Sequence, residues 1–75
     1  MIRYNNLGND SGVAAYEIES SSITVQFNDG WFYLYTAQSA GAANVEQMKR
    51  LAIAGQGLNS FINRVVRKGY ARKWR

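Results

Sequence analysis

The chain has 75 residues with nine Lys or Arg, five Asp or Glu, no His and no Cys, and a formal net charge of +4. This length suits a single domain over residues 1–75 with a small core, and the 47% apolar content favours a folded chain over a disordered one. The absence of cysteine and histidine removes disulfides, thiolate nucleophiles, the usual general base and the commonest metal ligands. We therefore expect a protein that is not an enzyme and that uses no metal and no cofactor.

The N-terminal residues lack the apolar stretch of a signal peptide, and no run is long enough to cross a bilayer. We expect a cytoplasmic protein that does not enter the membrane. Residues 5–12 are small and polar, which predicts a loop. The segments 1–12 and 71–75 are expected to be flexible termini.

Residues 13–36 show the period-two alternation of strands. Residues 13–19 place Tyr16 and Ile18 on one side and the glutamates on the other, and residues 23–28 alternate apolar and polar side chains. Residues 28–30, Asn-Asp-Gly, are a strong hairpin signal, and residues 31–36 form the returning strand. The pattern predicts three antiparallel strands.

The hairpin decides where three large rings point, because Trp31, Tyr33 and Tyr35 share one face of the returning strand. A two-residue turn pairs Phe27 with Phe32 and leaves the three rings on the outer face, as a platform for stacking. A three-residue loop pairs Phe27 with Trp31 and turns the rings into the core. We favour the core orientation, because rings of this size supply much of the burial in a small domain.

A first helix is predicted from Val45 to about Ala54. Asn44 is the expected N-cap, with Gln47 in the capping-box position and Glu46 in the first turn, where the helix dipole favours a negative charge. Gly55 is the expected C-terminal stop. The residues expected to face the core are Val45, Met48, Leu51, Ala52 and Ile53.

A second amphipathic helix is predicted from the spacing of Leu58, Phe61, Ile62 and Val65, and we expect it to end at Gly69. Two helices on one sheet are the natural way to cover its apolar face. The predicted fold is therefore α+β, with a three-stranded antiparallel sheet followed by two helices that pack on one of its faces.

The cations are concentrated in the C-terminal third. Eight of the nine Lys and Arg residues lie beyond residue 46, and all five acids lie at or before it. In the second helix three cations share a stripe opposite the apolar face, and the tail adds three cations and two aromatics, which suits phosphate pairing and base stacking. The candidate nucleic-acid-binding residues are Arg64, Arg67, Lys68, Arg72, Lys73 and Arg75, with Tyr70 and Trp74. The alternative is a solvated basic face that only keeps the chain soluble.

Two segments resemble a known family. Residues 25–35 are similar to the V-x-F-x-x-G-x-x-Y-x-Y centre of KTSC domains, which are named for the C-termini of some lysyl-tRNA synthetases and also occur as free-standing small bacterial proteins. Residues 61–70 resemble the family's closing element, with Asn63, Arg67 and Tyr70 at matching positions. The resemblance covers residues 13–70 and implies a small α+β domain with a suggested role in RNA binding. The chain departs from the family pattern at residues 37–41, which replace a frequent valine-proline.

Two functions of different classes follow from these observations. The first is a nucleic-acid-binding module, favouring RNA, in which the C-terminal cations contact phosphates. The second is a protein-interaction or assembly module, such as an adaptor or a phage-like inhibitor, which binds an acidic protein partner or pairs through a sheet edge. A homodimer is a further expectation, since it would add stability that so short a chain lacks.

Overall fold

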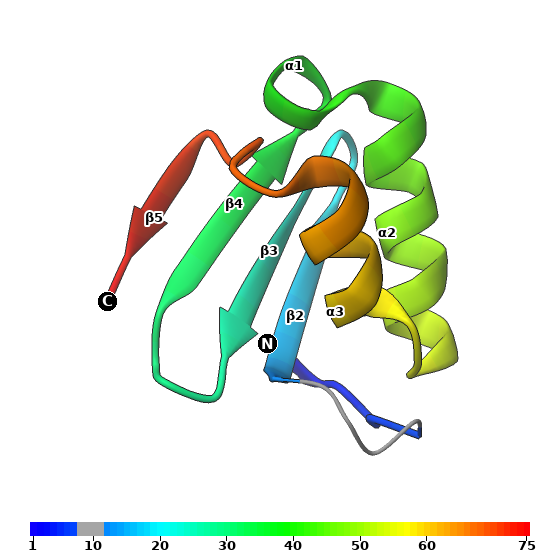
Figure 1. The fold of residues 1–75 in the computed structure, drawn as a ribbon, viewed down its shortest axis with the longest axis vertical. Coiled ribbons are helices and arrows are strands. Elements are labelled where there is room, and N and C mark those ends of the chain that lie inside the picture. Colours follow the sequence, from blue (N-terminus) through cyan, green and yellow to red (C-terminus); the bar gives the residue numbers. More distant parts are fainter. Residues whose placement is uncertain (8–11) are drawn as a thin grey trace.

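The computed structural model describes residues 1–7 and 12–75, and residues 8–11 of the predicted loop lie outside the described residues. The fold is α+β, as predicted (Figure 1). The strands are β1 (Ile2–Arg3), β2 (Val13–Glu19), β3 (Ser22–Phe27), β4 (Phe32–Thr36) and β5 (Arg72–Trp74). The helices are α1 (Ala37–Ala40), α2 (Ala42–Ala54), α3 (Leu58–Phe61) and the π-helical turn η1 (Ile62–Val66).

The sheet has five strands in the order β1-β2-β3-β4-β5, and each pair of neighbours is antiparallel. The prediction of three strands was therefore wrong. The additional strands lie at the two edges, where Ile2 pairs with Tyr16 and Trp74 pairs with Phe32. They have two and three residues, which is too short for an alternating pattern to show in the sequence. Both lie within the segments expected to be flexible termini.

The β3–β4 hairpin has the three-residue loop. The N–H of Phe27 donates to the carbonyl of Trp31 at 2.9 Å, and Val25 pairs with Tyr33. Gly30 takes a φ of +92° in the loop, a backbone conformation that a side chain would disfavour. The register turns Tyr33 and Tyr35 to the core side, and only 1% of Tyr35 is exposed. The core orientation is confirmed for Tyr33 and Tyr35, whereas Trp31 is half-buried outside the core, with Lys73 and Arg75 over its ring.

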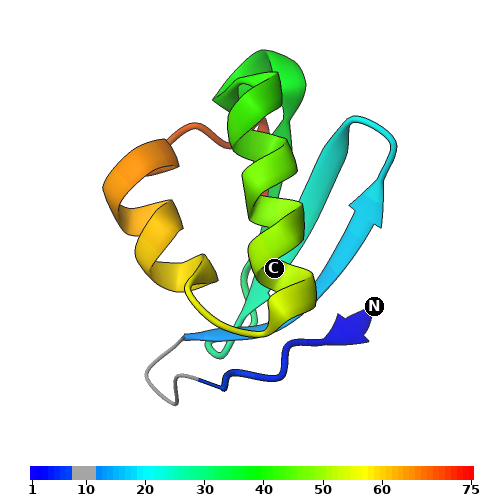
Figure 2. The same ribbon diagram turned by 90° about the vertical axis from the view of Figure 1, so that its right-hand side faces the viewer.

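The described helices all lie on one side of the sheet, and Figure 2 shows this arrangement edge-on. On α2, Val45, Met48 and Ala52 are buried as predicted. Ile53 was expected to face the core, but 66% of it is exposed. The fourth buried residue of α2 is instead Lys49, which lies one helical turn after Val45 and on the same face.

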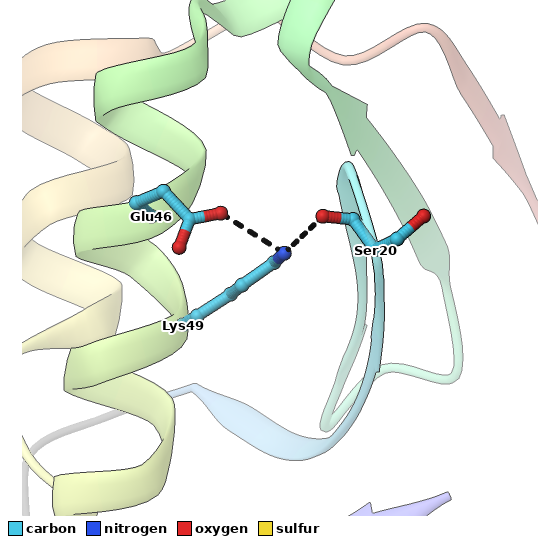
Figure 3. Close-up of polar contacts among 3 residues, drawn as sticks. All are labelled: Ser20, Glu46 and Lys49. Carbon is cyan, nitrogen blue, oxygen red and sulfur yellow. Dashed lines mark hydrogen bonds and ion pairs between the residues drawn. The ribbon is translucent and has the colours of Figure 1, made fainter.

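Lys49 links α2 to the turn between β2 and β3 by a hydrogen bond (Figure 3). Its Nζ donates to the carbonyl oxygen of Ser20 at 2.9 Å and to Oε2 of Glu46 at 3.1 Å. Only 11% of the Lys49 side chain is exposed, and its ammonium group keeps both of these partners. Lys49 and Glu46 therefore already have partners within the protein.

The helical region begins earlier than the sequence predicts. Thr36 caps α1 in a reciprocal capping box with Ser39, and Gly41 joins α1 to α2. Asn44 is not the N-cap, because it lies inside α2 and its Nδ2 donates to the carbonyl of Ala40 at 2.8 Å. Glu46 is consequently outside the first turn. The predicted stop at Gly55 is confirmed, with a left-handed backbone and N–H bonds back to the last turn.

The second helix ends earlier and with a wider turn than predicted. The N–H of Arg67 donates to the carbonyl of Ile62, five residues back, which defines the π-helical turn η1. The wider turn rotates Val65 away from the side of Ile62, so Val65 is 49% exposed, whereas Val66 stays on that side and is buried. The helix ends at Val66, and the predicted end at Gly69 was wrong.

Candidate nucleic-acid interface

A groove of about 490 Å³ lies between the core side of the β3–β4 hairpin and the end of η1. Its lining residues belong to the sheet and its loops, to η1, and to the segment from η1 into β5. The lining residues are Gly12, Phe27, Asn28, Asp29, Tyr33, Tyr35, Ile62, Asn63, Arg67, Lys68, Tyr70 and Lys73. Aromatic and cationic side chains therefore meet in one concave site.

The aromatic part of the lining is a set of edge-to-face rings. The ring of Tyr33 lies 5.2 Å from that of Phe27 and 5.0 Å from that of Tyr70, with both pairs close to perpendicular. Tyr70 also packs edge-on against Tyr35 at 6.4 Å. Such pairs hold one another in place, because the positive edge of one ring meets the negative face of the next.

Tyr35 forms the deepest part of this lining. Burial raises the pKa of its hydroxyl well above the ordinary tyrosine value, and the neighbouring Tyr33 and Tyr70 add to the rise. The raised pKa means that the folded protein favours the protonated, uncharged form of this side chain.

Three cations surround the rings. Arg67 and Lys68 follow η1 directly, and Arg67 adopts a φ of +39°, which is uncommon for a residue with a side chain. Lys73 enters from β5, with its Nζ 5.1 Å from the centre of the Trp31 ring and 5.7 Å from that of Tyr33. These distances are in the range of cation–π attraction.

The groove cations have no carboxylate partner among the described residues. Lys49 and Glu46 form the one ion pair in that part of the chain, and it lies on α2. Asp29 also lines the groove, where its Oδ1 accepts a hydrogen bond from the N–H of Trp31 at 3.0 Å; its one negative charge against three cations leaves the lining with a formal net charge of +2. Positive charge is therefore available to a ligand.

The other predicted site residues lie outside this groove. The cationic stripe predicted for Arg64, Arg67 and Lys68 does not form, because the helix ends at Val66; Arg64 is exposed on η1 and does not line the groove. Arg75 lies over the ring of Trp31 at 5.6 Å.

Arg72 and Trp74 lie on the opposite side of the sheet from the groove. The ring of Trp74 stacks on that of Phe32, with centroids 5.4 Å apart and planes 10° from parallel. The guanidinium carbon of Arg72 lies 5.2 Å from the centre of the Trp74 ring. The tail residues are thus divided between the two faces, as the alternation of a strand requires.

Sequence reasoning missed the polar lining at Asn28 and Asn63. Asn63 did carry a signal, since it is one of three positions, with Arg67 and Tyr70, that resemble the closing element of KTSC domains. All three line the groove. Asn28 was read only as a turn residue, and it reaches the groove because the hairpin loop closes one end of it.

Comparison with known proteins identifies no relative of this chain. No family model, no curated protein and no solved structure matches this chain. The resemblance to KTSC domains therefore stays a prediction. In the part of the chain that the structure describes, no helix has both the length and the apolar character needed to cross a membrane.

Proposed function

We propose that this protein is a non-catalytic module that binds single-stranded nucleic acid, and RNA in particular, in the groove between the β3–β4 hairpin and η1. The observation that carries the proposal is the convergence of Arg67, Lys68 and Lys73, without an acid partner among the described residues, on a lining of tyrosines.

This combination fits the chemistry of a single strand. Phosphates pair with the cations and release condensed counterions, which supplies most of the affinity. Unpaired bases present flat faces to aromatic rings and polar edges to amides and hydroxyls, which Tyr33, Tyr70 and Asn63 offer in the groove. A base held in a duplex exposes neither face.

The test is a titration of the protein with a fluorescent single-stranded RNA at several salt concentrations, followed by fluorescence anisotropy. We expect affinity to fall as salt rises, because each released counterion contributes to the slope. Arg67→Gln with Lys73→Gln should weaken binding about tenfold or more at low salt and flatten the slope by roughly 0.7 per lost phosphate contact.

The matched control removes the same charge elsewhere. Arg3→Gln with Arg50→Gln lowers the net charge equally, and neither residue lines the groove. We expect this control to bind nearly as the wild type does. The proposal fails if the wild type does not bind, if binding ignores salt, or if the two double variants lose affinity equally.

A further inference from the structure

The outer face of the sheet, which we define as the side opposite the helices, carries an apolar patch on β4 and β5. Phe32 and Leu34 of β4 and Trp74 of β5 point to this side, since they alternate with the core-facing Tyr33 and Lys73. Phe32, Leu34 and Trp74 are only half-buried, and every described helix lies on the other side (Figure 2). This apolar patch is therefore open to a partner.

Opposite charges lie on two other strands of this face, β2 and β5. Glu17 of β2 pairs with Thr24, Thr24 pairs with Leu34, and Leu34 pairs with Arg72 of β5. Glu17 and Arg72 are thus in one row across the sheet and are both exposed. Three strand spacings of about 4.8 Å separate them, so roughly 14 Å keeps them from pairing within one chain.

We propose that the outer face is the interface of a homodimer, in which a second copy packs face to face about a two-fold axis parallel to the strands between β3 and β4. This rotation lays β5 of each copy over β2 of the other. Arg72 of one copy then meets Glu17 of its partner, twice by symmetry. Phe32 and Leu34 then lie over Gln26 and Thr24 on β3 of the second copy, in the aligned packing of a β-sandwich.

The distribution of charge selects a second copy over other occupants. The acids Glu17 and Glu19 lie on β2, beside Arg3 of β1, and Arg72 lies on β5, so Glu17 and Arg72 can pair between two copies. A polyanion would meet repulsion from the two glutamates. Four short strands make a small interface, which places the dimer among weak, concentration-dependent associations.

Reciprocal charge reversal tests the interface. Glu17→Arg alone places two arginines opposite each other at both contacts, and Arg72→Glu alone places two glutamates there. We expect each variant alone to raise the dimer dissociation constant about tenfold or more in sedimentation equilibrium. An equimolar mixture of the two variants restores both oppositely charged contacts, so it should form a heterodimer with nearly wild-type affinity.

Arg64→Glu is the control, because it reverses a charge on η1, on the helix side of the sheet. It should dimerise like the wild type, and circular dichroism should show all variants folded, since the altered positions are exposed. A wild type that stays monomeric up to about millimolar concentration, in the regime of weak complexes, overturns the proposal. So does a mixture that fails to restore association, or single variants that dimerise like the wild type.

The dimer and the proposed RNA binding are tested separately. The groove lies on the helix side of the sheet and Glu17 does not line it. Glu17→Arg should thus disrupt the dimer without weakening RNA binding, whereas loss of RNA binding in the groove variants leaves the dimer proposal standing.

Discussion

The hydroxyl of Tyr4 accepts a hydrogen bond from the backbone N–H of Leu58 at 3.2 Å, joining the segment after β1 to the first residue of α3. The first N–H groups of a helix have no partner within the helix, and the preceding Gly57 has no side chain to cap them. Tyr4 is 3% exposed, so water cannot easily replace it. One aromatic side chain from the N-terminal segment therefore completes a helix in the C-terminal half.

Tyr4→Phe should lower the free energy of unfolding by about 1–3 kcal/mol, because it leaves a buried N–H without an acceptor. Urea unfolding followed by circular dichroism measures the change. Tyr16→Phe is the control: Tyr16 is 6% exposed, and its hydroxyl makes no hydrogen bond to another residue that the structure describes. An equal loss in both variants would contradict the role of the Tyr4 hydroxyl.

The π-helical turn predicts which of two adjacent valines stabilises the fold. Val66→Ala should cost about 1–3 kcal/mol, since Val66 is 7% exposed and its methyl groups pack in the core. Val65→Ala should change stability by less than about 0.5 kcal/mol. The reverse order, measured by the same unfolding experiment, would indicate a regular α-helix through these residues.

Lys49→Met should destabilise the protein by about 1 kcal/mol, because it removes the donor to the Ser20 carbonyl. Glu46→Gln should cost only about 0.2–0.5 kcal/mol, since the Glu46 side chain is 56% exposed and water screens the pair. Thermal unfolding of both variants checks the order. If Glu46→Gln were the more costly, the ion pair and not the contact with the turn would be the important interaction.

Because Tyr35 is buried, we expect the protein to lose stability at alkaline pH. Burial raises the pKa of Tyr35 in the folded state, so the folded protein holds this proton more tightly than the unfolded chain does. The contribution is fully present below the ordinary tyrosine pKa of about 10 and is lost as the pH rises above it. Urea unfolding of the wild type and Tyr35→Phe between about pH 8 and pH 11 should show a smaller alkaline decline in the variant. Parallel declines would contradict this assignment.

Two glycines that both have a positive φ should tolerate alanine differently. Gly55 has a φ of +80°, and a Cβ there would come within 2.8 Å of the Cβ of Asn5. Gly30 has a φ of +92°, but a Cβ would meet nothing within 4 Å. Gly30→Ala should therefore cost only the conformational strain of about 1–2 kcal/mol, and Gly55→Ala should cost more. Equal losses in chemical denaturation would mean that the segment at Asn5 moves aside freely.

Part of the candidate site was predictable from the sequence, because charge and aromatic content are properties of the chain itself. The concentration of cations beyond residue 46 pointed to Arg67, Lys68 and Lys73, and to the aromatic Tyr70 that lies between them in the sequence. The gathering of these side chains with Tyr33 was not predictable. It depends on where the helix ends and on β5 returning beside β4, and both result from contacts between segments far apart in the chain.

The sequence by itself determined the elements with long, regular patterns: the alternation that makes β2, β3 and β4, the apolar stripe of α2 and its stop at Gly55. These follow from local periodicity and backbone preference, which each segment carries alone. Only the tertiary structure decided the loop of the β3–β4 hairpin, the two edge strands, the π-helical turn and the burial of Lys49. For each of these features, the segment taken alone can adopt more than one conformation at nearly the same free energy. Packing against a partner element selects one of them, because burial of apolar surface outweighs so small a difference.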